Sequence, residues 1–410
     1  MKSMEQLVDV YNLSPMQEGM LFHSLMDKDS RAYFWQTLLS LHGNIDWEVL
    51  EKSINRVIRR YEVLRTVFLF EDLRQPLQVV LKERRLKVDY RDISHLHEDE
   101  RKELVKEFCR QDRERGFDLS KDLLMRITLF KIEPDDYKLV WSSHHIIMDG
   151  WCLGILFGDF LKFYSVLVRG GEAEEPGPAV PYRRYIEWLE KQDKQKGLAY
   201  WREYLDGYDR QATLPTTGDR WSTVQADGYD RKQHTIILGA PLVDGLAGIA
   251  NRALTPLAVV LQTLWGVLLQ KYNNTTDVVF GMVVSVRPPE IEGIEQMAGL
   301  FINTTPMRVK TGGNKTFFQL LHALYGQLIK SKEAEYLPLA EIQAQCLLKN
   351  RLFNHLMAIQ NYPFEESLKT MGNEAETGFR IESVESFERA EYAFNIIITP
   401  ADSGNVTFSF

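Results

Sequence analysis

Two adjacent histidines and an aspartate in the first half of the chain have the types and spacing of a chemical site. Residues 142–151 read Ser-Ser-His-His-Ile-Ile-Met-Asp-Gly-Trp, so His145 lies four residues before Asp149, and Gly150 follows. An imidazole with a reference pKa of about 6.5 can hold or accept a proton near neutrality. A helix start offers free backbone N–H groups to a developing negative charge. The segment therefore predicts a site in which an imidazole and a backbone donor act together.

The elements around this segment predict how it is held. Residues 123–131 and 137–143 read as two strands around the turn Glu133-Pro134-Asp135-Asp136. Residues 151–168 carry apolar side chains at helical spacing. The histidines and Asp149 therefore belong to a loop between a strand and a helix, and such loops present side chains from a rigid scaffold.

The two histidines do not form a metal clamp. Neighbours in an extended segment point to opposite faces, so only one of His144 and His145 can face a given cleft. No Cys, Glu or third His lies at ligand spacing nearby in the sequence. We predict no metal site, and we interpret Cys152 as a small packing residue of the helix.

The remaining periodicity predicts two α/β lobes. Residues 169–181 combine glycine, proline and charge without periodicity, which is typical of a linker. We place an N-terminal lobe at 1–170, the linker at 171–181 and a C-terminal lobe at 182–410. Further helices are expected near 46–61, 98–115, 182–205, 241–253, 255–272 and 316–334. Further strands are expected near 64–70, 77–82, 232–238, 277–285, 352–360, 378–386, 391–399 and 405–410.

Composition excludes several classes of protein. The 410 residues are 44% hydrophobic and carry a formal charge of −8, which argues against a nucleic-acid partner. No apolar run reaches the roughly 18 residues that a membrane span needs. Three cysteines are too few and too scattered for a disulfide framework. We predict a cytoplasmic enzyme that does not bind membranes.

The segment around His145 resembles a known family signature. The pattern His-His-x-x-x-Asp-Gly-Trp is similar to that of condensation domains of non-ribosomal peptide synthetases, in the chloramphenicol acetyltransferase superfamily. Five further segments resemble the other motifs of these domains in the expected order, and a sixth is a weaker match: Leu13–His23, Arg60–Phe68, Tyr182–Trp188, Gly299–Thr304, Asn361–Glu365 and, the weaker one, Glu391–Asn395. The resemblance covers essentially the whole chain.

The resemblance implies an architecture and partners. It implies two acetyltransferase-like lobes forming a V-shaped pseudo-dimer with an active-site tunnel between them. It also implies donor and acceptor peptidyl carrier proteins with phosphopantetheine arms, no permanently bound cofactor, a monomer, and an adjacent adenylation domain. The chain stops in a strand pattern, where we expect a closing helix, so we expect a truncated piece of a larger synthetase.

The implied reaction is attack of an acceptor aminoacyl amine on a donor peptidyl thioester. His145 would act as general base or only hold the amine by a hydrogen bond, and the sequence leaves both open. The N–H of Gly150 would donate to the tetrahedral oxyanion. In the superfamily the residue that matches Asp149 pairs with an arginine and braces the loop. We expect Arg60 or Arg65 of the second motif as its partner and favour Arg65; His144 would face the scaffold.

Other matching residues are expected to support the site. Arg287 and Asn303 belong to this group, and Val286 stands where the family usually has glycine, which puts the local turn in doubt. Ser-Pro-Met-Gln-Glu-Gly-Met at 14–20 favours the subtype that takes a D-configured donor and an L-configured acceptor. An epimerisation domain, a non-catalytic recruiting module and an acetyltransferase that uses coenzyme A are the alternatives. The segments at 14–19 and 361–365 favour condensation over epimerisation.

Overall fold

The chain folds into two α/β units that each contain a large sheet. The computed structural model describes residues 7–26, 33–172, 174, 177–214, 233–360, 374–388, 392, 394–400 and 404–410. The described residues of the first unit fall within Met1–Lys191, Arg287–Phe301 and Phe364–Arg389. Those of the second unit fall within Gln192–Val286, Ile302–Pro363 and Ala390–Phe410.

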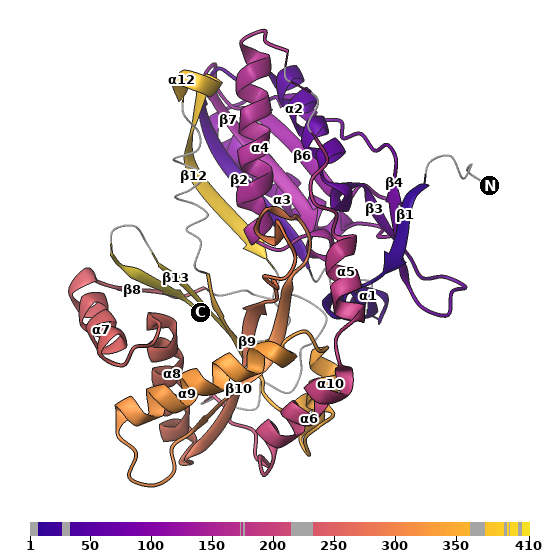
Figure 1. Cartoon of the computed structure of the whole chain (residues 1–410). Helices are drawn as coiled ribbons and strands as arrows, with labels where there is room; N and C mark the ends of the chain where they lie inside the picture. The colour runs from indigo at the N-terminus through magenta and orange to yellow at the C-terminus, as the bar shows by residue number, and fades with distance from the viewer. Residues whose placement is uncertain are drawn as a thin grey trace. The chain divides into compact units, whose positions relative to one another are not determined.

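A five-stranded sheet forms the centre of the first unit. Its order is β12-β2-β7-β6-β5, with the bounds Phe379–Glu388, Phe34–Gly43, Asp136–His144, Met125–Lys131 and Asp89–Asp92. The strand β2 pairs antiparallel with both β7 and β12. Figure 1 shows β12, in yellow near the end of the chain, beside the indigo β2 from near its beginning. Segments far apart in the sequence therefore share one sheet.

Helices cover both faces of this sheet: α2 (Trp47–Arg60) and α4 (Trp151–Val168) on one face and α3 (Glu98–Arg115) on the other. The α3 carboxylate of Asp112 accepts hydrogen bonds from Gln36 of β2 and Ser142 of β7. On the opposite face, Trp141 of β7 packs against Phe157 of α4, with ring centroids 6.2 Å apart. The sheet is therefore buried between helices, and its ends and loops are what remain to form a site.

The apolar helix α4 could cross a membrane if only its length and composition are considered. The bent pair α7 (Ala240–Arg252) and α8 (Leu257–Asn273) would also pass this test if the two helices counted as one span. In this fold α4 packs against α2. Its buried side chains are Cys152, Leu153, Leu156, Phe157, Phe160, Leu161 and Tyr164. These contacts are those of a core helix.

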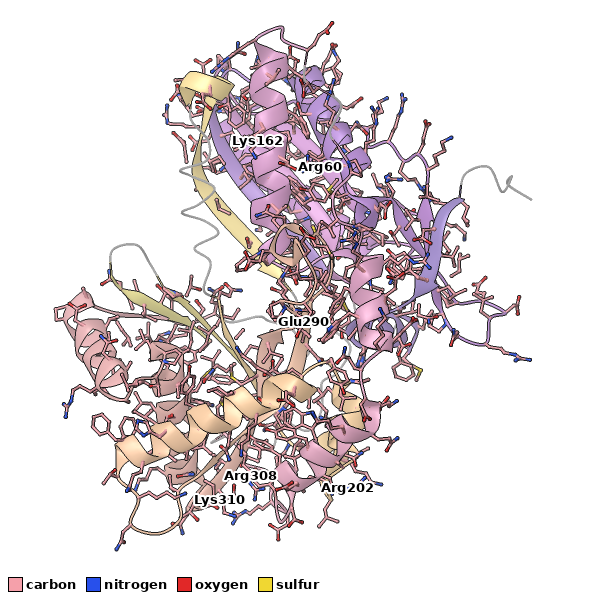
Figure 2. All side chains as sticks on the ribbon, in the orientation of Figure 1. Arg60, Lys162, Arg202, Glu290, Arg308 and Lys310 are labelled. Carbon is pink, nitrogen blue, oxygen red and sulfur yellow. The ribbon has the colours of Figure 1, made fainter. Side chains whose placement is uncertain are left out.

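Smaller elements complete the first unit. A second sheet has the order β1 (Leu7–Asn12), β4 (Leu77–Leu81) and β3 (Thr66–Leu69), and the helical segments are α1 (Pro15–Met26), η2 (Glu62–Arg65), α5 (Arg183–Glu190), η5 (Ile294–Gln296) and α12 (Glu374–Thr377). Arg60, labelled in Figure 2, places its Nε 3.1 Å from the Asp159 carboxylate of α4. Lys162 lies 3.7 Å from the same carboxylate. This cluster links the end of α2 to the middle of α4.

The second unit contains a six-stranded sheet. Its order is β10 (Ile302–Lys310), β9 (Asp277–Ser285), β11 (His355–Ile359), β13 (Phe394–Pro400), β14 (Val406–Ser409) and β8 (Thr235–Leu238). Besides α7 and α8, its helical segments are α6 (Lys194–Leu205), α9 (Phe317–Ser331), η6 (Lys332–Ala334), α10 (Leu339–Gln343) and η7 (Lys349–Arg351). Arg308 and Lys310 of β10, both labelled in Figure 2, lie 2.6 and 3.8 Å from Asp277 of β9.

The division into units differs from the lobes expected at 1–170 and 182–410. The first unit extends to Lys191 and also takes in Arg287–Phe301 and the described part of Phe364–Arg389. The described part of Phe364–Arg389 belongs to the first unit because β12 pairs with β2 along the whole strand. The helix expected at 182–205 is also two helices, because Asp193 caps the start of α6 by accepting from the N–H groups of Gln195 and Lys196.

Candidate active site

The segment around the histidines is a short loop between β7 and α4. The strand ends at His144, the 3-10 turn η3 (His145–Ile147) follows, and α4 begins at Trp151. Gly150 precedes α4 with φ −61° and ψ −28°, so this backbone does not need the freedom of glycine. The side-chain amide of Gln17, in the opening motif, donates to the Ile146 carbonyl at 2.9 Å and fixes the loop from α1. The expected strand, loop and helix are thus confirmed.

His144 belongs to the scaffold. It pairs with Phe34 in the sheet, and its side chain is buried between Tyr33 and Phe117. Its Nδ1 accepts a hydrogen bond from the Ile146 N–H at 3.1 Å. Burial, with a smaller contribution from the neighbouring His145, lowers the pKa of His144 to about 3. A histidine that stays neutral and caps a turn fixes the backbone rather than exchanging protons.

His145 points away from His144 and stacks on Trp35. The two rings lie 5.6 Å apart at an angle of 18°. Nδ1 lies 3.3 Å from the carbonyl oxygen of Met148, and Nε2 lies 3.3 Å from a carboxylate oxygen of Glu388. Burial acts to lower the pKa of His145, but the Glu388 carboxylate, the Met148 carbonyl and the charge of Asp149 together raise it above its usual value. The site therefore favours a protonated imidazole more than bulk water does.

Glu388 is the residue that sequence reasoning missed. It is the last residue of β12 and lies opposite Trp35 of β2 in the register. Its side chain is 49% exposed, while that of His145 is 8% exposed. No local pattern marks it, because the carboxylate reaches His145 only through the pairing of β12 with β2. A strand predicted near 378–386 does not by itself reveal its partner.

Asp149 is a bracing residue at the start of α4. Its side chain is 1% exposed, and its Oδ2 accepts from the Phe301 N–H at 3.0 Å. Its Oδ1 lies 3.2 Å from the Cys152 thiol and 3.5 Å from Nη2 of Arg287. Its own N–H donates to the Gly299 carbonyl at 3.2 Å. The carboxylate therefore ties the loop to the segment at 287–301.

The expected arginine partner of Asp149 was wrong. Arg65, the favoured candidate, is committed to backbone carbonyls, and Arg60 pairs with Asp159 instead. The carbonyls that accept from Arg65 are those of Ile58, Arg59, Leu81 and Lys82. Arg287 occupies the place that was predicted for Arg65, because the segment that carries it belongs to the first unit. Arg65 and Arg60 therefore bind other groups of the first unit and not Asp149.

Arg287 is held firmly beside Asp149. Its Nη1 donates to the carbonyls of Ile294 at 2.6 Å and Met297 at 3.0 Å. Its guanidinium lies 3.9 Å from the centre of the Phe301 ring, a cation–π arrangement. Val286 does not adopt a positive φ, so the turn there forms without glycine.

Cys152 and Gly299 pack the loop against the fourth and fifth motifs. The Cys152 thiol is fully buried and receives the Gly299 N–H at 3.3 Å, and burial raises its pKa far above the usual range. Such a thiol is a packing group and not a nucleophile. A Cβ on Gly299 would lie 2.1 Å from Cδ2 of Tyr182, whose hydroxyl donates to the Leu300 carbonyl at 2.6 Å. Only glycine permits this approach.

Asn303 supports the second unit rather than the loop. Its Nδ2 donates to the carbonyls of Glu335 at 2.5 Å and Leu337 at 2.7 Å, and its Oδ1 accepts from the Thr304 N–H at 2.8 Å. The segment 361–365 and residues 391 and 393 lie outside the described residues. Within the part of the chain that the structure describes, no group of three or more His, Cys, Asp or Glu side chains is placed to hold a metal ion.

Comparison with known proteins gives matches over nearly the whole chain. The sequence profile described as "Condensation domain" matches residues 8–410. The chain is 42% identical over 406 residues to gramicidin S synthase 2 of Brevibacillus brevis, covering 99% of this chain and 9% of that protein. It is 42% identical over 408 residues to tyrocidine synthase 2 of Brevibacillus parabrevis, covering 100% of this chain and 11% of that protein. The chain thus spans about a tenth of the length of these relatives.

Solved structures agree with the fold. The starter condensation domain of the rhizomide synthetase RzmA superposes with a TM-score of 0.76 at 19% identity, covering 98% of this chain and 90% of that one. The first condensation domain of the CDA synthetase superposes with a TM-score of 0.75 at 16% identity, covering 98% of this chain and 92% of that one.

Proposed function

Because the chain belongs to the condensation-domain family of non-ribosomal peptide synthetases, we propose that it forms peptide bonds between carrier-bound substrates. The observation that carries the proposal is the state of His145. Its ring is stacked on Trp35 and oriented by the Met148 carbonyl. Among the described residues its buried Nε2 has no hydrogen-bond partner, and the Glu388 carboxylate lies 3.3 Å away. In the neutral ring the lone pair of Nε2 receives no hydrogen bond from these residues, so this nitrogen can accept a proton from a substrate amine.

The proposed step moves one proton through His145. The acceptor amine attacks the carbonyl carbon of the donor thioester, and a C–N bond forms. The N–H bond breaks and its proton passes to Nε2. The C–S bond then breaks, and the leaving thiolate takes up the proton from Nε2 to give a thiol on the donor arm. Positioning of two bound substrates supplies much of the acceleration, and general base work typically adds 10²–10⁴-fold.

The oxygen of the tetrahedral intermediate needs a donor, and we propose the Gly150 N–H for this role. Gly150 immediately precedes α4, so the positive end of the helix dipole lies at this point. Asp149 and Arg287 act indirectly, since they hold the loop that carries both groups.

The proposed partners follow from the family. They are donor and acceptor peptidyl carrier proteins, whose phosphopantetheine arms deliver the acyl groups, and an adenylation domain of the same synthetase. No permanently bound cofactor is required by this chemistry. We also propose a cytoplasmic monomer that takes a D-configured donor residue and an L-configured acceptor. Loading the donor carrier with either enantiomer and comparing the product yields tests the stereochemical preference.

A reconstituted coupling reaction tests the function. Donor and acceptor carriers are loaded, mixed with the chain, and the acceptor-bound dipeptidyl product is measured by mass. We expect product with the wild type and a loss of at least about 100-fold with His145→Ala. His42→Gln is the matched control, because it removes a half-buried imidazole from β2 of the same sheet. Deuterium exchange at the donor α-carbon without coupling would instead indicate epimerisation, and the absence of both would contradict the proposal.

A further inference from the structure

A carboxylate from the end of the chain faces the histidine of the motif loop. Oε1 of Glu388 lies 3.3 Å from Nε2 of His145. Glu388 stands opposite Trp35 in the antiparallel pairing of β12 with β2, so the two side chains project from the same face of the sheet. The imidazole stacks on the Trp35 ring, which places its edge toward the carboxylate.

The contact between Nδ1 of His145 and the Met148 carbonyl determines whether Nε2 carries a proton where it faces Glu388. The Met148 carbonyl can only accept, so Nδ1, 3.3 Å away, carries the proton in the neutral ring. Neutral His145 therefore presents the lone pair of Nε2 to a carboxylate, an unfavourable arrangement. Once Nε2 is protonated, the same geometry becomes an ion pair between largely buried and half-exposed partners.

We propose that Glu388 is a positioning residue that acts through His145 by stabilising the protonated form of its imidazole. This inference rests on the proposed function for its catalytic consequence. When the amine proton reaches Nε2, the carboxylate of Glu388 balances the charge of the imidazolium until the leaving thiolate takes the proton. Glu388 does not itself exchange a proton in this step.

Other groups around the imidazole contribute less to this effect. Asp149 lies on the same loop, but its carboxylate is already bound by the Phe301 N–H and faces Arg287. His144 stays neutral, since burial lowers its pKa to about 3. Among the groups that act on His145, the charge of Glu388 is the largest influence that favours protonation.

Histidine NMR tests the inference without any activity measurement. The protein is labelled at histidine Cε1, the His145 signal is assigned by its loss in His145→Gln, and its pKa is measured in the wild type and in Glu388→Gln. We expect a wild-type pKa above 6.5 and a fall of about one unit in Glu388→Gln, the low end of the range for an opposite charge, because Glu388 is half exposed. Glu388→Asp keeps the charge but shortens its reach, so the pKa of His145 in this variant should lie between its values in the wild type and in Glu388→Gln.

Glu385→Gln is the matched control. It removes the same charge from β12, and Glu385 lies three residues from Glu388, so its side chain points to the opposite face. This variant should leave the pKa of His145 unchanged. Two results would overturn the inference. One is a pKa of His145 below 6.5 in the wild type, which needs no variant to measure. The other is an equal pKa of His145 in Glu388→Gln and in the wild type.

The coupling reaction separates this inference from the proposed function. If the wild type makes product, Glu388→Gln should slow coupling at high pH and shift the lower limb of the pH profile to lower pH, by the change in pKa that NMR records. An NMR shift without product in the wild type would leave the electrostatic role of Glu388 intact and refute the condensation activity. Product formation with an unchanged pH profile in Glu388→Gln would refute the role of Glu388 alone.

Discussion

Removing the Asp149 carboxylate should destabilise the first unit strongly. Asp149 is 1% exposed, and in Asp149→Ala the Phe301 N–H loses its acceptor while the side chain of Arg287, 9% exposed, loses its counter-charge. A buried donor without a partner costs about 1–3 kcal/mol. Breaking one side of a buried ion pair costs about 3–5 kcal/mol in all. The Oδ1–Nη2 distance of 3.5 Å, together with the two carbonyls that still hold Arg287, favours the lower half of that range.

Urea unfolding measures this loss. We expect the free energy of unfolding in Asp149→Ala to fall by about 3–4 kcal/mol, a large share of the 5–15 kcal/mol typical of a domain, with a lower soluble yield. Asp136→Ala, at the start of the β7 strand that leads into the loop, is the control, since its partner His42 and the carboxylate are 35% and 44% exposed. That variant should change stability by less than about 1 kcal/mol.

A double-mutant cycle isolates the interaction with Arg287. Because Arg287→Met removes the charge that Asp149→Ala leaves unpaired, the double variant should be less destabilised than the sum of the single variants. Additive effects, or an Asp149→Ala protein as stable as Asp136→Ala, would refute the role of Asp149 as a brace.

Three further changes have clear expected results. Gly299→Ala puts a methyl group 2.1 Å from Cδ2 of Tyr182, so we expect urea unfolding to show a destabilisation of about 1–3 kcal/mol or more, together with reduced coupling. A urea midpoint equal to that of the wild type would contradict this close contact. Gln17→Leu removes the donor to the Ile146 carbonyl, and we expect a stability loss of about 1–3 kcal/mol. In coupling assays the variant should lose a larger fraction of its turnover, measured as kcat, than of its substrate binding, measured from KM. Burial raises the pKa of Glu335 to about 7, so its folded state keeps a proton that the unfolded chain releases above about 4.5. Stability should therefore decline as pH rises through this range, and Glu335→Gln should stabilise the protein by up to about 3 kcal/mol at pH 8 but little at pH 4.5; equal effects at both pH values would contradict the burial argument.

The sequence predicted those parts of the fold whose signals are local. The helices α3 and α4 occupy the expected residues, since each has apolar side chains at helical spacing and a recognisable end. The strand β2 was not predicted, because all its residues are buried or half-buried and it lacks the alternation of a half-exposed strand. The strand β12 was predicted, but its place beside β2 was not, because strand pairing is a non-local choice.

The candidate site divides in the same way. His145, Asp149 and Gly150 lie within one short segment, so their types and spacing identified the loop. The partners that define their chemistry come from other segments, Arg287 beside Asp149 and Glu388 beside His145. Arg65 was favoured as the brace because its motif matched, and its bonds to backbone carbonyls became visible only in three dimensions.

The most direct test of the account is the pH dependence of a single turnover of coupling. An acceptor amine whose own pKa lies below the range scanned keeps its protonation constant, so the profile reports on the enzyme. Because only neutral His145 can accept the proton, and because its surroundings raise its pKa, the rate should fall as pH drops through a value above 6.5. The residual rate of His145→Gln should not vary with pH. A wild-type rate that is constant across this range would contradict proton transfer to His145.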